Sequence, residues 1–206
     1  MPRHVLSFAP SPKLTLALLA AIVLAAGVPA AAAGMQTQTS IYSPFAASGQ
    51  PAAHVVSTVR GHCWTGSLAV NHQDAWRCLS GNFIYDPCFS SAAAAGIVLC
   101  PASGPWGSSA IEIKLTQRLP SKFGNKGGPS TSGVPWALVT LAGWKCKLAT
   151  GATTVIDGER QNYFCTGTKD ALWGAPSRAS EPWRIYAAPN GATKLSRRVE
   201  IKSAWF

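Results

Sequence analysis

The clearest pattern in the chain is an alternation of apolar and polar side chains over residues 110–117. Isoleucine or leucine stands at positions 111, 113 and 115, while charged or hydroxyl side chains stand between them. A two-residue period of this kind predicts a strand with one buried face. Residues 197–206 alternate in the same way. Residues 97–100 form a short apolar run typical of a buried strand, and residues 183–187 are expected to form a further strand.

Two turn signals predict hairpins. Residues 136–141 and 144–149 flank Ala142-Gly143, and Asp157-Gly158 separates a strand ending near residue 156 from residues 160–166. Asp157-Gly158 is a strong two-residue turn signal, and Ala142-Gly143 suits a tight hairpin. Short strands, frequent turns and few helical periods together predict a mainly-β fold, as a single small sandwich or barrel-like domain.

One short helix is expected near residues 74–80. Asp74 can cap its N-terminus, and Gly81-Asn82 provides the kind of stop that ends helices.

The first 33 residues have the pattern of an export signal. Residues 1–13 are basic, residues 14–28 form an apolar run of 15, and Ala31 and Ala33 supply an A-x-A site. The run is shorter than the roughly 18 residues that a spanning helix needs. We therefore predict cleavage after Ala33, an extracellular protein and no stable membrane insertion afterwards; an uncleaved anchor is the alternative.

The domain is expected to begin well after the signal. Residues 34–58 contain no Lys, Arg, Asp or Glu and are rich in small and polar residues, which predicts a flexible leader. Residues 59–206 are then sufficient for one domain with its own core.

All six cysteines lie beyond the signal, and no pair has the C-x₂₋₄-C spacing of a zinc site. Disulfides in an oxidising compartment are therefore expected, with no metal. Spacing alone leaves several pairings open, and we favour local ones, each worth about 3 kcal/mol. The predicted pairs are Cys63–Cys78, Cys88–Cys100 and Cys146–Cys165.

Positive charge is concentrated in the second half. Removal of Arg3 and Lys13 with the signal lowers the formal charge from +10 to +8, and all of this excess lies within residues 110–206. Positive charge concentrated in one part of a protein attracts polyanions. The expected partner is an anionic envelope polymer or glycan, and nucleic acid is not favoured. Because no compact Lys/Arg cluster occurs, a purely solubilising role is the alternative. The candidate anion-binding residues are Lys145, Lys147, Arg197, Arg198 and Lys202.

Eight tryptophans are many for this length, and most are expected in the core. Trp106 and Trp173 each stand beside a glycine and are expected to be exposed, where they could stack on sugar rings.

The GHCW segment at residues 61–64 is similar to the G-S-C-W around the catalytic cysteine of papain-like proteases, and more loosely to the cysteine segment of bacterial amidase-peptidases. Both families require a histidine well downstream, whereas the last histidine here is His72. His72 and Asp74 could form the base and the orienting carboxylate of a serine hydrolase triad. The chain contains no G-x-S-x-G motif, however, to expose the serine nucleophile. No catalytic residue and no cofactor are therefore predicted.

Several short segments together resemble a family of exported proteins of actinobacterial type, over residues 61–206. They are CWTGSLA, DAWRC, GNFIYDPCF, PWAL, NYFC and the terminal AWF. The resemblance implies a disulfide-containing exported domain of a bacterium and no particular activity. We expect a non-catalytic binding domain; a secreted hydrolase of cell-wall or extracellular polymer, and a protein-interaction or inhibitor module using residues 122–132, are the alternatives.

Overall fold

The computed structural model describes residues 35–121, 127–195 and 197–206. Within these ranges the chain forms thirteen strands and no helix, which confirms the β fold class. No helix there is long and apolar enough to cross a membrane. The predicted signal, residues 1–33, lies outside the described residues.

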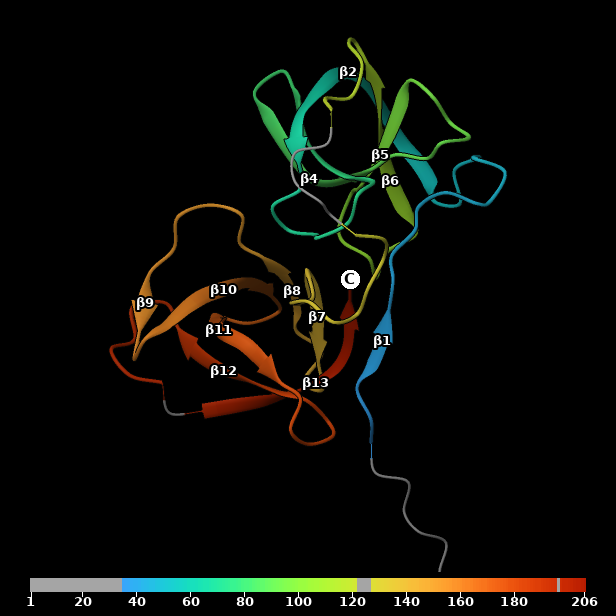
Figure 1. The fold of residues 1–206 in the computed structure, drawn as a ribbon. Helices are drawn as coiled ribbons and strands as arrows, with labels where there is room; N and C mark the ends of the chain where they lie inside the picture. Colours follow the sequence, from blue (N-terminus) through green and yellow to red (C-terminus); the bar gives the residue numbers. More distant parts are fainter. Residues whose placement is uncertain (1–34, 122–126, 196) are drawn as a thin grey trace, which may run out of the picture. The chain divides into compact units, whose positions relative to one another are not determined.

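Residues 54–115 form a closed barrel (Figure 1). Its strands follow chain order, the last pairing in parallel with the first and the other neighbours antiparallel. They are β2 (His54–Gly66), β3 (Ala75–Ser80), β4 (Phe83–Phe89), β5 (Ile97–Pro101) and β6 (Ser109–Leu115). The predicted strands at 97–100 and 110–117 are thus confirmed as β5 and β6.

The helix predicted at residues 74–80 is wrong, because this segment is strand β3. Gly81-Asn82, expected as a helix stop, is the two-residue turn between β3 and β4, with Ser80 paired to Phe83 and Gly81 at a φ of 56°. Trp76 and Cys78 are both buried while Arg77 between them is not, which is the two-residue period of a strand.

Residues 137–205 form a second sheet, which also closes on itself. The strand order is β13-β12-β11-β10-β8-β7, and β7 pairs back to β13. Its strands are β7 (Ala137–Thr140), β8 (Lys145–Leu148), β9 (Val155–Ile156), β10 (Glu159–Thr166), β11 (Asp170–Ser177), β12 (Arg184–Pro189) and β13 (Arg197–Trp205).

Both predicted hairpins are confirmed in this sheet. Strands β7 and β8 pair around Gly143, and β9 and β10 pair around Asp157-Gly158. Asp157 has a φ of 50° and Gly158 a φ of 80°. A two-residue turn with both central residues in this region is the type that matches the twist of paired strands.

The described part of the segment expected as a flexible leader, residues 35–58, contains strand residues. Strand β1 (Gln38–Ser40) pairs in parallel with β13, and β2 already begins at His54. Thr37 is buried: its hydroxyl donates to Ile201 O and accepts from Trp183 N, both at 2.8 Å. The pairing of β1 with β13 is made by main-chain groups. Such pairing requires no alternation of apolar side chains, so the sequence carried no periodic signal for this strand.

Three disulfides join paired strands, and all three predicted pairs are confirmed. Cys63–Cys78 links β2 to β3, Cys88–Cys100 links β4 to β5, and Cys146–Cys165 links β8 to β10. No cysteine of the described residues is free.

Candidate functional site

A cleft of about 800 Å³ lies along the outer face of β8 and β10. Lys145 and Lys147 line it from β8, and Phe164 and Thr166 line it from β10. Lys147 stands directly opposite Phe164, and Lys145 opposite Thr166.

Strand alternation explains why these four side chains share a face. Cys146 and Cys165 are register partners and form a disulfide within the sheet. Neighbouring positions on a strand point to opposite faces, so the residues on either side of each cysteine point outward. Lys145, Lys147 and Phe164 are accordingly exposed, Phe164 to 55%.

The two lysines carry unneutralised charge. The ion pairs found among the described residues are Arg77–Asp86, Arg184–Glu200 and Arg197–Asp170, and none of them involves a lysine. Two like charges on one strand face repel each other. An anion placed between the two ammonium groups relieves that repulsion.

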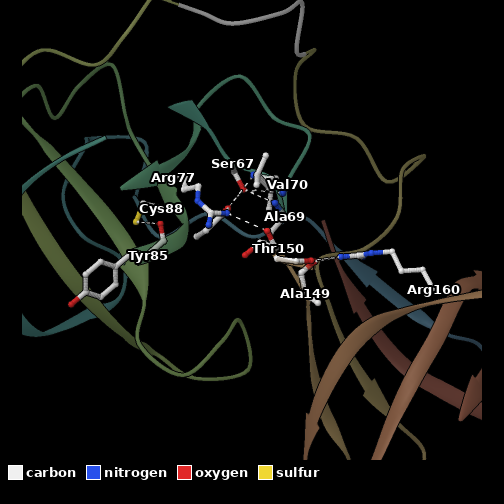
Figure 2. A network of polar contacts seen from close by, with 12 residues as sticks. Ser67, Ala69, Val70, Arg77, Tyr85, Cys88, Ala149, Thr150 and Arg160 are labelled. Carbon is white, nitrogen blue, oxygen red and sulfur yellow. Dashed lines mark hydrogen bonds and ion pairs between the residues drawn. The ribbon is translucent and has the colours of Figure 1, made fainter. Parts of the chain in front are cut away.

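The loop 149–151 forms one wall of the cleft and is held from two sides (Figure 2). Arg77 of β3 donates to Thr150 O at 3.4 Å. Arg160 of β10 donates to Ala149 O at 3.3 Å and to Gly151 O at 2.7 Å. The bond to Gly151 O has the short length of a charge-assisted hydrogen bond, and the two longer bonds add to it, so arginines on β3 and β10 both restrain this wall.

Asp86 also lines the cleft, but its negative charge is already matched. Its carboxylate accepts from the Ser67 hydroxyl, from Leu68 N at 3.1 Å and from Arg77 at 3.2 Å. The Asp86 side chain is 2% exposed and the Arg77 side chain 16%. The charge that the cleft offers to a ligand therefore comes from Lys145 and Lys147.

Comparisons with protein-family models, curated proteins and solved structures found no match for this chain. Its function is therefore argued from its own residues.

The other three basic residues predicted to bind anions do not line this cleft. Arg197 is paired with Asp170 and lies over the Trp144 ring at 5.3 Å. Arg198 donates to Tyr186 Oη at 2.8 Å, and Lys202 is exposed on β13. The structure thus brings together Lys145 and Lys147 and places the remaining three on β13.

Trp106 is half-buried and lines the cleft. Its ring packs edge-on against Trp205, with 6.2 Å between centroids, and passes close over Gly104. A Cβ built on Gly104 would lie 2.5 Å from the Trp106 ring, so this position requires glycine.

Trp173 is not exposed as predicted: it is fully buried. It lies on β11 between β10 and β12, packs with Ile156, Ala171 and Ala188, and its indole donates to Ala188 O at 3.5 Å. Phe164 is an exposed aromatic residue of the cleft that sequence reasoning missed. Its position between inward-facing Tyr163 and Cys165 was the signal that could have found it.

The described residues show no assembled catalytic set. The Cys63 sulfur is part of a disulfide and is no nucleophile. His72 Nδ1 accepts from Asp74 N at 3.0 Å, whereas in a catalytic triad Nδ1–H donates to a carboxylate. No metal-binding cluster of His, Cys, Asp and Glu occurs in the described ranges. Of the loop suggested for an inhibitor, residues 122–126 lie outside the described residues.

Proposed function

We propose that this chain is a secreted, non-catalytic binding protein whose β8–β10 cleft holds a segment of an acidic glycan. The observation that carries the proposal is the placement of Lys145, Lys147 and Phe164 on one face of a cleft with a fixed wall. The volume of about 800 Å³ falls within the roughly 300–1,000 Å³ typical of ligand clefts.

An acidic glycan fits this combination of groups. Its carboxylates or sulfates pair with the two ammonium groups, and its sugar rings offer apolar faces for the exposed Phe164 ring. Trp106 borders the same cleft and extends the apolar surface.

Secretion is part of the proposal. Three disulfides among the described residues support an oxidising compartment, since they are rare in proteins of reducing ones. The signal pattern of residues 1–33 points the same way.

The test is binding of polygalacturonate, with uncharged dextran as the reference polymer. The double variant K145A/K147A should lose about tenfold or more in affinity. Its plot of log affinity against log salt concentration should also become less steep, by roughly one to two units, because fewer counterions are released on binding.

The matched control is K114A/K194A, which removes the same charge from exposed lysines that do not line the cleft. If both double variants lose affinity equally, the positive charge acts as a general field and the cleft proposal fails. Equal binding of dextran and polygalacturonate would also contradict it.

A further inference from the structure

The hairpin between β3 and β4 exposes two large apolar side chains. Phe83 is 71% exposed and Ile84 is 53% exposed. Among the large apolar side chains that the structure describes, Phe83 has the greatest exposed fraction, and no other two exposed ones are sequence neighbours. Apolar side chains exposed singly are common on protein surfaces, whereas clustered ones indicate an interaction site.

The fold holds this hairpin in a fixed register. Ser80 pairs with Phe83, and Leu79 pairs with Ile84. Gly81 has a φ of 56°, which suits the first central position of a two-residue hairpin turn. A disulfide fastens β3 to β2 just behind the turn. A tip restrained in this way loses little conformational freedom when it binds a partner.

Two exposed cations lie beside the turn. Ser80 Oγ donates to Arg60 O at 2.8 Å, so Arg60 of β2 is next to the end of β3. Lys114 of β6 is the register partner of Arg60 in the parallel pair that closes the barrel. Both side chains are exposed.

A third exposed cation, Arg118, belongs to the same end of the barrel. Thr116 N, two positions before it, donates to Gly61 O at 2.8 Å, and Gly61 follows Arg60 in the chain. Leu119, the next residue, packs against the apolar core of the barrel. Arg118 lies between these two attachments and is exposed.

The positive charge at this end is not neutralised by acids. None of the ion pairs found among the described residues includes one of these three cations. Residues 60–61, 79–85 and 113–121 contain three Lys or Arg residues and no Asp or Glu. The acid that comes nearest along β6 is Glu112, which accepts from the Thr58 hydroxyl at 3.4 Å. This end of the barrel is therefore both apolar and positively charged.

We propose that the β3–β4 hairpin docks this protein onto the surface of an anionic lipid bilayer. Phe83 and Ile84 enter the boundary between headgroups and acyl chains, and the three cations face the lipid phosphates. Insertion of apolar side chains and attraction between cations and anionic lipids strengthen each other in peripheral membrane binding. A second copy of this chain fits the hairpin less well, because two such tips in contact would bring like charges together.

The experiment is co-sedimentation with vesicles of phosphatidylcholine, prepared with and without phosphatidylglycerol. The protein is the compact unit Gly34–Phe206, so that the apolar run of residues 14–28 cannot carry the binding. Partitioning onto the anionic vesicles should exceed that onto the neutral ones by about tenfold or more. R60Q/R118Q should remove most of this preference. Equal partitioning onto both vesicles, or onto neither, would overturn the proposal.

F83S/I84S should lower partitioning onto the anionic vesicles by about tenfold, because the inserted apolar surface is lost. The matched control is V134S/V155S, at side chains that are 46% and 61% exposed elsewhere, and it should bind as wild type does. F83W should retain binding, because an indole suits the membrane interface; this variant gives a readout that does not depend on the folding of F83S/I84S. Equal losses in the two serine variants, or loss of binding in F83W, would contradict insertion of the hairpin.

Two further measurements separate this proposal from other contacts. K145A/K147A should bind the vesicles as wild type does, whatever its effect on glycan binding; a loss there would assign the lipid contact to the β8–β10 cleft and overturn the role of the hairpin. Sedimentation velocity tests the second copy. A dimer that F83S/I84S abolishes, together with no binding to anionic vesicles, would assign the hairpin to self-association instead.

Discussion

The barrel of β2 to β6 and the sheet of β7 to β13 both close on themselves, but they differ in charge and in the composition of their cores. Residues 54–115 carry three basic and three acidic residues, whereas residues 137–206 carry ten basic and five acidic ones. Four of the seven residues in the main buried cluster of the barrel are disulfide cysteines. The main cluster of the second sheet contains ten buried residues, among them Tyr163, Trp183 and Ile201.

The region with two disulfides in its core is therefore a different one from the region that carries the excess positive charge. A short chain buries too little apolar surface to be stable by packing alone, and disulfides compensate in the first barrel. The second sheet has a larger apolar core, so its outward positions are available for lysines without a loss of packing. The proposed binding cleft accordingly lies on the region that depends least on covalent links.

The largest expected effect comes from removing disulfides. Replacing Cys63, Cys78, Cys88 and Cys100 by serine should cost about 6 kcal/mol, twice the roughly 3 kcal/mol expected for replacing Cys146 and Cys165. Hydrogen exchange read by mass spectrometry should show residues 54–115 losing protection in the fourfold variant while residues 137–205 keep theirs. Simultaneous loss in both regions would show that they unfold as one unit and would break the comparison.

A smaller effect is expected from the buried ion pair of the barrel. Arg77→Ala leaves the Asp86 carboxylate buried without a cation and should cost about 3 kcal/mol in urea unfolding. Arg184→Ala breaks an exposed pair of the second sheet, with side chains 50% and 39% exposed, and should cost less than about 1 kcal/mol. Similar losses in the two variants would contradict the assignment of Asp86 as a buried charge.

The smallest effect concerns pH. Burial lowers the pKa of His72 below its usual value of 6.5, and Asp74 opposes this shift. The unfolded chain then takes up the proton at higher pH than the folded one, so stability is full above pH 6.5 and is lost as the pH falls through the folded-state pKa.

His72→Gln should therefore flatten the fall in melting temperature between pH 7.5 and 5. Asp74→Asn, which removes the opposing charge, should make that fall steeper. A melting temperature whose pH dependence is the same in wild type and His72→Gln would refute this role of His72.

Local sequence signals predicted the elements whose causes are local. The turns at Gly143 and Asp157-Gly158 and the alternation over residues 110–117 need no distant partner, and the structure confirms them. The helix at 74–80 failed because Gly81-Asn82 serves equally well as a helix stop or a hairpin turn. The choice between these depends on pairing with β4, which periodicity over six residues does not reveal.

The site could be predicted in part for the same reason. The shared outward face of Lys145 and Lys147 follows from strand alternation. The contact of Arg77 with Thr150, and the meeting of Tyr42 with Trp136, join segments far apart in the chain. No sequence spacing specifies such meetings, because Arg77 belongs to the barrel and Thr150 to the loop after β8, and Tyr42 and Trp136 are 94 positions apart.

The most direct test of the account is a lysine-labelling footprint, in which an amine-reactive reagent is applied with and without polygalacturonate and the modified peptides are read by mass spectrometry. We predict that the polymer protects Lys145 and Lys147, while Lys114 and Lys194 react at unchanged rates. Equal protection of all four lysines, or protection of none, would contradict binding in the β8–β10 cleft.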